Sequence, residues 1–405
     1  MTRPLAAVRT CLIGSLLWIA IWAAVAEAGE IERQRELFRG AYADVERGNW
    51  AVIDSLSQDD QASLQRYILW PDLRATWLRS SIDSVSEAEI AAFVQQYGTL
   101  KPARELRYRH ALNFVRNDDL AGYLRIYEQF YQGQDIAKLD CLALQAEIEA
   151  GRHQRVEVRA IELWLTGKSQ VSECDPVFKY LGNRNLLGLV EYQKRFDLAV
   201  EARSFALAKW LAKKIDQQHV DTAANWQQAQ ANPEDFLRYD WKISGDATLR
   251  EQLIYAAERL TYRDPEIAAD LWGRTEKHFN FSESQKLRTA RHIALWTARD
   301  NLAGAYKQLR QLPAAAEDEE VLRWRARTSL REAKWKRLLT DIAAMDDAER
   351  NSEEWRYWQA IAQIETGQAL AAIADLESLR LERSFYGFLA ADKLARTTRS
   401  TTQVS

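Results

Sequence analysis

The chain has 405 residues, and 47% of them are hydrophobic, which is enough to bury a sizeable core. Its formal net charge of −3 argues against a protein that binds nucleic acid without regard to sequence, because such proteins need a surplus of lysine and arginine. Glycine (16 residues) and proline (7 residues) are scarce while helix-forming residues are abundant, so the composition predicts an all-α protein.

The first 28 residues have the pattern of a secretory signal peptide. Arg3 and Arg9 precede a continuous apolar run at 11–26, and small residues close that run in an A-x-A cleavage pattern. The run of about 16 residues is shorter than the roughly 20 that a membrane-spanning helix needs. We therefore expect residues 1–28 to direct export and to be removed, leaving a chain that begins at Gly29 and has no stable membrane span.

Turn-like sequences recur between the helical segments that follow. Their centres are Gly48, Asp118, Gly151, Phe196, Asp264, Asp300, Ala333 and Gly367. Most steps between these centres are close to about 34 residues or twice that number, which is the length of a helix–turn–helix pair. Serial pairs of this kind stack into an α-solenoid.

The helices after these turns carry the apolar stripe that stacking requires. In one of them Trp335, Leu338 and Ile342 occupy positions i, i+3 and i+7. Helices this short are marginal alone, so we expect each pair to bury its stripe against the next. We interpret residues 29–394 as one repeat domain, and we expect ARTTRSTTQVS at 395–405 to form a disordered polar tail.

The stretch IELWLTGKSQVSECDPVF at 161–178 contains Gly-Lys-Ser, the last part of a phosphate-binding loop in nucleotide-binding proteins. Such a loop also needs a first glycine at the position where this chain has Glu162. It needs a preceding strand too, whereas this chain continues a helical pattern there. We therefore interpret the stretch as a helix–turn segment.

Two cysteines, Cys141 and Cys174, remain after the predicted cleavage site. In an oxidising compartment an even pair is most simply a disulfide. Two buried free thiols are the alternative. We favour the bridge, which would tie down the turn that contains Gly-Lys-Ser.

Residues suited to catalysis or metal binding are scattered through the chain. The histidines form no H-E-x-x-H motif and do not pair with the cysteines; they are His110, His153, His219, His278 and His292. Runs of carboxylates, such as the one at 317–320, are typical of solvated helical surfaces. We therefore expect no metal site, no cofactor and no catalytic residue in this chain.

The segment RWRARTSLREAKWKR at 323–337 combines basic residues with two tryptophans. One interpretation is a basic groove that faces an anionic polymer, with Arg323, Arg325, Arg327, Arg331 and Lys334 as the candidate contacts. The other is a pair of amphipathic helices whose tryptophans face the core and whose arginines face water. We favour the second, because one of the tryptophans belongs to an apolar stripe.

Several segments resemble one known family. They are QRELFRGAYADVERG (34–48), FVQQYGTLKPARELRYRHAL (93–112), KLDCLALQAE with Cys141, ELWLTGKSQ with the following Cys174-Asp175, EEWRYWQA (353–360) and SFYGFLAADKL (384–394). Taken in this order, they make the chain after residue 28 similar to the N-terminal part of the soluble lytic murein transglycosylases, which are periplasmic enzymes of Gram-negative bacteria.

The resemblance implies a right-handed α-superhelix, ring- or horseshoe-shaped, that precedes a linker domain and a lysozyme-like catalytic domain in the family. The family cleaves the β-1,4 bond between N-acetylmuramic acid and N-acetylglucosamine and forms a 1,6-anhydro product. One glutamate acts as acid and then as base. Peptidoglycan glycan strands are therefore the implied partner, other cell-wall enzymes are further candidates, and the periplasm is the implied location.

The sequence departs from the family at the catalytic motifs. The family's catalytic domain carries a Glu-Ser motif and a G-L-M-Q segment, whereas the only methionine after residue 28 is Met345, in DIAAMDDAE. The match ends near Leu394. We therefore expect this chain alone to be enzymatically inactive and to act as the peptidoglycan-accommodating part of such a protein. The alternative is a self-standing periplasmic scaffold that binds protein partners or cell-wall strands.

Overall fold

The computed structural model describes residues 29–242 and 246–402. The predicted signal peptide, residues 1–28, lies outside these ranges. Within them the chain forms helices and turns and no strand, which confirms the all-α prediction. The described residues divide into two compact units between Gly188 and Leu189.

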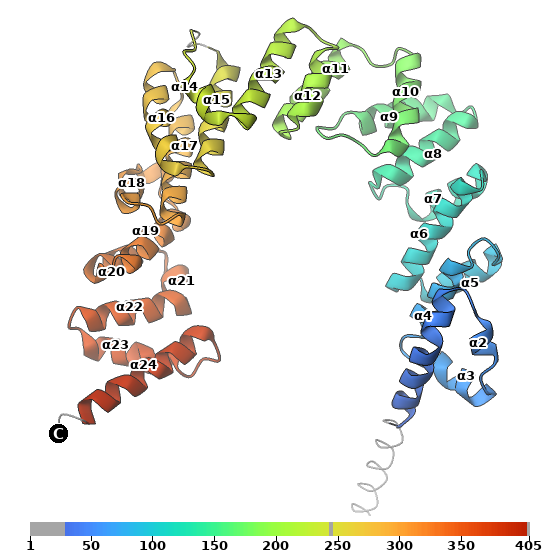
Figure 1. Cartoon of the computed structure of the whole chain (residues 1–405), viewed down its shortest axis with the longest axis horizontal. Coiled ribbons are helices and arrows are strands. Elements are labelled where there is room, and N and C mark those ends of the chain that lie inside the picture. Colours follow the sequence, from blue (N-terminus) through green and yellow to red (C-terminus); the bar gives the residue numbers. More distant parts are fainter. Residues whose placement is uncertain (1–28, 243–245, 403–405) are drawn as a thin grey trace, which may run out of the picture. The chain divides into compact units, whose positions relative to one another are not determined.

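The first unit begins with helical residues 29–46 and continues through short helices in chain order (Figure 1). They are α2 (Ala51–Asp54), α3 (Gln58–Gln65), α4 (Trp70–Ser80), α5 (Glu87–Tyr97), α6 (Lys101–Arg116), α7 (Leu120–Phe130), α8 (Ala137–Glu149), α9 (His153–Trp164), the 3-10 helix η1 (Ser172–Cys174) and α10 (Asp175–Asn183).

The second unit continues the same pattern. Its elements are α11 (Leu189–Glu201), α12 (Phe205–Ala212), α13 (Gln217–Ala231), α14 (Pro233–Arg238), α15 (Ala247–Thr261), α16 (Pro265–His278), α17 (Glu283–Arg299), α18 (Ala305–Gln311), η2 (Ala314–Ala316), α19 (Glu319–Arg331), α20 (Trp335–Ala343), α21 (Asp347–Arg350), α22 (Glu353–Glu365), α23 (Ala369–Leu379) and α24 (Phe385–Thr402).

Consecutive helix pairs bury their apolar stripes against each other, as the periodicity predicts. In the second unit, Leu338 and Ile342 of α20 pack with Trp355 of α22 in one core cluster. Ile361, also on α22, packs with Leu376 of α23 in the next cluster. The helices α19, α20, α22 and α23 follow one another as a stack in Figure 1. The predicted solenoid of helix pairs is therefore confirmed within this unit, while the ring or horseshoe shape stays a prediction.

Residues with a left-handed backbone conformation follow the ends of many helices. Gly151 and Gly367 have φ angles of 73° and 84°, and both stand at centres that the sequence marks as turns. After each of them the next backbone N–H reaches back five residues, as in the bond from Gln368 to the Gln363 carbonyl oxygen at 2.7 Å. This pattern satisfies carbonyl groups that the helix end leaves free, and glycine adopts it at little cost.

Two predicted details differ from the structure. Phe196, expected at a turn, is buried inside α11, and the chain turns instead at Arg203, where φ is 57°. The last helix α24 reaches Thr402 and so includes much of the segment 395–405 that the sequence predicts as a disordered tail. Neither glycine nor proline occurs in that segment, so no residue in it breaks the helix.

Candidate functional site

The basic segment 323–337 covers the end of α19 and the start of α20, and most of its arginines have partners on neighbouring helices. Arg323 donates to Glu349 at 3.2 Å, and Arg327 forms an ion pair with Glu354 at 3.3 Å. Arg331 donates to the Ala298 carbonyl oxygen at 2.8 Å. These bonds link α19 to the helices on both sides of it, so the arginines hold the stack together instead of forming a row of free cations.

Arg325, one of the predicted polymer contacts, is only 2% exposed and cannot meet a polymer. Its guanidinium pairs with Glu317 at 2.9 Å and with Asp341 at 3.2 Å. Asp341 is itself fully buried and also accepts hydrogen bonds from Ser329 at 2.6 Å and Tyr306 at 3.0 Å. The prediction that Arg325 contacts a polymer must therefore be corrected, because the side chain is buried. The two carboxylates make this burial possible, since a buried charge needs partners.

A shallow pocket of about 660 Å³ lies beside the basic segment. It is formed by the turn between α19 and α20 and the turn after α22, and its residues are Ala333, Lys334, Trp335, Lys336, Arg337, Glu365, Thr366 and Gly367. We call it the Trp335 pocket. Lys334 and Lys336 are exposed and have no ionic partner among the described residues, whereas Arg337 is paired with Glu332.

The Trp335 pocket therefore retains the part of the predicted basic patch that can meet a ligand. Trp335 is half-buried and packs against two core clusters. Two free ammonium groups beside an aromatic ring suit a saccharide chain that carries carboxylates, because the ring can stack on a sugar and the ammonium groups attract anions. The basic pattern in the sequence includes Lys334 but does not distinguish it from the arginines that are paired in the fold.

The structure joins Cys141 of α8 to Cys174 of η1 in a disulfide, with the two Cα atoms 4.9 Å apart. Next to the bridge, the Glu173 carbonyl oxygen accepts a hydrogen bond from Gln145 at 2.6 Å. The Glu173 carboxylate pairs with Lys138 at 2.8 Å, and this hydrogen bond lowers the pKa of Glu173. The segment that contains Gly-Lys-Ser is thus a loop between α9 and η1, fixed at its end to α8.

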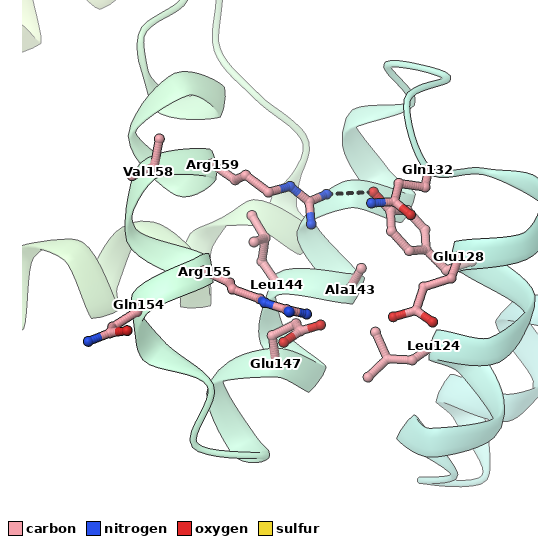
Figure 2. Close-up of a pocket in the computed structure, with 11 residues that line it drawn as sticks. Leu124, Glu128, Gln132, Ala143, Leu144, Glu147, Gln154, Arg155, Val158 and Arg159 are labelled. Carbon is pink, nitrogen blue, oxygen red and sulfur yellow. Dashed lines mark hydrogen bonds between the residues drawn. The ribbon is translucent and has the colours of Figure 1, made fainter.

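A cavity of about 400 Å³ lies among α7, α8 and α9 in the first unit (Figure 2). Arg159 donates to the Tyr127 hydroxyl group at 2.7 Å, the bond drawn in the figure, and Tyr127 donates to Asp140 at 2.5 Å. Burial raises the pKa of Tyr127 to about 12, so its hydroxyl group stays protonated at neutral pH.

Two more charged groups line this cavity. Arg155 of α9 and Glu128 of α7 extend toward the same space from opposite sides (Figure 2). Both are exposed and have no ionic partner among the described residues. The sequence did not predict this site, because its residues come from three helices, and the quoted segment KLDCLALQAE, which includes three of them, carries a resemblance and no sign of a cavity.

The remaining predictions concern metals and membranes. Across residues 29–242 and 246–402, no group of three histidine, cysteine or carboxylate side chains is arranged to hold a metal ion. None of the helices in those ranges combines the length and the apolar character that a membrane span requires.

Similarity to known proteins extends over most of the chain. It is 24% identical over 378 residues to the soluble lytic murein transglycosylase of Escherichia coli (strain K12), an alignment that covers 91% of this chain and 56% of the relative. The protein of the same name from Salmonella typhimurium (strain LT2) is 23% identical, with 95% and 58% covered. No family model matches the chain.

Solved structures agree. An inactive mutant of the lytic transglycosylase Slt from Pseudomonas aeruginosa superposes with a TM-score of 0.61 at 28% identity, covering 89% of this chain and 57% of that one. The 70-kDa soluble lytic transglycosylase of Escherichia coli superposes with a TM-score of 0.65 at 22% identity, covering 90% and 58%. This chain thus spans between half and two thirds of the length of the proteins it matches. The resemblance suggested by the sequence is confirmed: the chain is a homologue of the soluble lytic murein transglycosylases over that length and shares their helical fold.

Proposed function

We propose that this chain is a periplasmic protein of the lytic murein transglycosylase type whose stacked helix pairs accommodate peptidoglycan strands. The observation that carries the proposal is the similarity to murein transglycosylases, which runs through 91% of the chain. The signal-peptide pattern at 1–28 and the Cys141–Cys174 bridge both support export, because disulfides persist in oxidising compartments.

The proposal separates binding from cleavage. The relatives are transglycosylases, but the similarity covers 56% of the Escherichia coli protein, and the present chain has no segment like the G-L-M-Q motif of the family. We therefore propose that these 405 residues hold strands without cutting them. Cleavage of murein is therefore ascribed to the relatives and not to this chain.

The Trp335 pocket is the proposed contact with the wall polymer. Its two free lysines can bind the carboxylates of the peptide stems, and Trp335 can stack on a sugar ring. Because exposed charges are screened by salt, binding through the lysines should weaken as the ionic strength rises.

Co-sedimentation with purified sacculi tests this function. We expect the whole chain to pellet with sacculi, and we expect the variant Lys334→Glu/Lys336→Glu to pellet several-fold less. The matched control is Lys213→Glu/Lys214→Glu, which makes the same charge change at exposed positions after α12 and should leave binding unchanged. Failure of the unaltered chain to pellet at low salt would contradict the proposal.

The same mixtures test the absence of cleavage. Soluble products released from the sacculi are separated by chromatography and identified by mass. We expect no 1,6-anhydromuropeptide above the level of a protein-free control. Steady release by the pure chain would show that it cuts strands itself.

A self-standing scaffold for protein partners is the second candidate. It is favoured by exposed apolar side chains near the start of α24, where Leu381, Phe385 and Phe388 are 78%, 69% and 71% exposed. A scaffold should retain one defined protein, for example another cell-wall enzyme, from periplasmic extract, and Phe385→Ser/Phe388→Ser should release it. Retention of sacculi with no protein retained would favour the first function.

A further inference from the structure

Another cavity in the first unit, of about 530 Å³, lies among α5, α6 and α7. Its walls include Ile90 and Val94 of α5 and Ile126 and Phe130 of α7. Its volume is within the range of about 300–1,000 Å³ that is usual for small-molecule sites, which are mostly apolar with a few polar groups. We call it the His110 cavity after one of the two polar residues that α6 contributes.

His110 is buried, with 8% of its surface exposed, and neither of its ring nitrogens has a hydrogen-bond partner in the described part of the chain. Its ring lies against that of Phe114, with the ring centres 4.5 Å apart. Burial lowers the pKa of His110, so at neutral pH the imidazole is uncharged and offers one donor and one acceptor. Buried polar groups almost always have hydrogen-bond partners, so the two unpartnered ring nitrogens indicate that a ligand binds beside His110.

Arg107, one turn before His110 on α6, is the second polar group in the wall of the cavity. Its guanidinium lies over the rings of Phe130 and Tyr131, 4.2 Å and 5.6 Å from the ring centres, and its Nε has no hydrogen-bond partner within the described ranges. No carboxylate among the described residues forms an ion pair with it. Glu87, the acid at the edge of the cavity, is already paired with Arg125 at 3.2 Å.

We propose that the His110 cavity binds a small organic acid. The ligand's carboxylate accepts hydrogen bonds from Arg107 and from the protonated ring nitrogen of His110, and its apolar body lies between α5 and α7. A doubly charged phosphate fits less well, because Glu87 stands at the edge of the site and Arg107 is its single unpaired cation. This inference goes beyond peptidoglycan binding and does not depend on it.

The test compares two probes that differ only in the acidic group, 4-phenylbutyrate and 4-phenyl-1-butanol. The whole chain is labelled with ¹⁵N in its histidine rings, and the signal that disappears in His110→Gln is assigned to His110. We expect phenylbutyrate to shift this signal saturably and the alcohol to bind at least ten-fold more weakly. No saturable shift with the acid, or equal affinity for both probes, would overturn the proposal.

A pair of variants on the same helix locates the carboxylate. Arg107→Met should weaken phenylbutyrate binding at least ten-fold, while Arg109→Met, which removes an exposed arginine from α6, should leave it unchanged. Wild-type affinity in Arg107→Met would also overturn the proposal. Should Arg107→Met fail to fold, the comparison of acid with alcohol on the unaltered chain still decides. Sacculus binding, measured separately, should be the same in both variants.

Discussion

At the scale of single residues, Asp341 organises the interior of the second unit. Its carboxylate is fully buried and accepts hydrogen bonds from Arg325, Ser329 and Tyr306. Burying a charge is costly unless it is paired, so the three donors and the one carboxylate depend on each other. Removing Asp341 would leave the buried Arg325 with Glu317 as its one remaining ionic partner among the described residues, and it would take the acceptor away from Ser329 and Tyr306.

We therefore predict that Asp341→Ala lowers the free energy of unfolding of the second unit by about 3–5 kcal/mol, the cost of breaking a buried ion pair. Asp347→Ala is the control, because Asp347 makes an exposed pair with Arg350 and should matter by less than about 1 kcal/mol. Urea unfolding followed by tryptophan fluorescence measures both. Equal small effects would show that the buried network contributes little.

His292 gives the second unit a dependence on pH. It lies beside Tyr262 and its Nε2 is 3.3 Å from the Glu258 carbonyl oxygen, and burial lowers the pKa of His292 in the folded state. A histidine with a lowered pKa takes up its proton more readily when the chain is unfolded. The contribution of the buried, neutral His292 to the stability of the fold is thus fully present above the ordinary histidine pKa of about 6.5, and it is lost as the pH falls below that value.

We expect the urea midpoint of the unaltered chain to fall between pH 7 and pH 5, and to fall less in His292→Gln. His278→Gln provides the control, since His278 is exposed at the end of α16 and should keep the wild-type profile. Parallel profiles for all three chains would contradict this assignment.

At the scale of elements, the helix-to-helix turns use the left-handed conformation whether or not glycine is present. Ala333, between α19 and α20, has φ of 49°, and the N–H of the following Lys334 bonds back to the Ser329 carbonyl oxygen at 2.9 Å. Gly367 ends α22 in the same manner. Alanine in this conformation brings its Cβ close to the following carbonyl oxygen, a strain of roughly 1–2 kcal/mol that glycine does not have.

Ala333→Gly should therefore raise the free energy of unfolding, by about 0.5–1 kcal/mol after the greater entropy of glycine in the unfolded chain is counted. Ala371→Gly makes the same substitution at an exposed position inside α23, where it should be destabilising by about 1 kcal/mol. Changes of the same sign in the two variants would refute the argument. Thermal unfolding of the two variants is a sufficient measurement.

The helices could be predicted because apolar spacing is visible in a sequence, and most turns could be predicted because glycine or a cluster of charged residues marks them. The turn at Arg203 could not be predicted, since an arginine carries no sign that it will adopt a positive φ. The charged residues around Phe196 resemble a turn in the sequence, although the Phe196 ring is buried in α11. The helix α24 runs into the segment at 395–405 because polar composition alone does not break a helix.

The candidate site was harder to predict than the fold. Arg323 and Arg327 form a dense basic stretch in the sequence, but their acidic partners Glu349 and Glu354 are 26 and 27 residues further along, on later helices of the stack. Which arginines are paired with an acid on a later helix cannot be read from the sequence until the order of the helices in the stack is known. The His110 cavity could not be predicted for a related reason: the histidine is visible in the sequence, but the cavity is formed by three helices whose packing is not.

At the scale of the molecule, the chain consists of two compact units, and the disulfide between Cys141 and Cys174 joins α8 to η1 in the first. A bridge stabilises mainly by restricting the unfolded chain, so its effect should be confined to the unit that contains it. The two units therefore offer an internal comparison that a single compact domain would not.

Cys141→Ser/Cys174→Ser should lower the stability of the first unit by about 3–4 kcal/mol, as expected for the loop of 33 residues that the bridge closes. Hydrogen exchange resolved by peptide is the appropriate measurement. We expect faster exchange in α8 and α9 and unchanged exchange in α22 and α23. Uniform acceleration across both units, or none, would contradict the picture.

The proposed function is tested most directly by sedimentation velocity of the whole chain mixed with soluble, uncleaved murein strands. The proposal predicts that the chain migrates with the strands, saturably as strands are added, and less so for Lys334→Glu/Lys336→Glu. Chain and strands that sediment independently at every concentration, at low salt and with the protein folded, would contradict it.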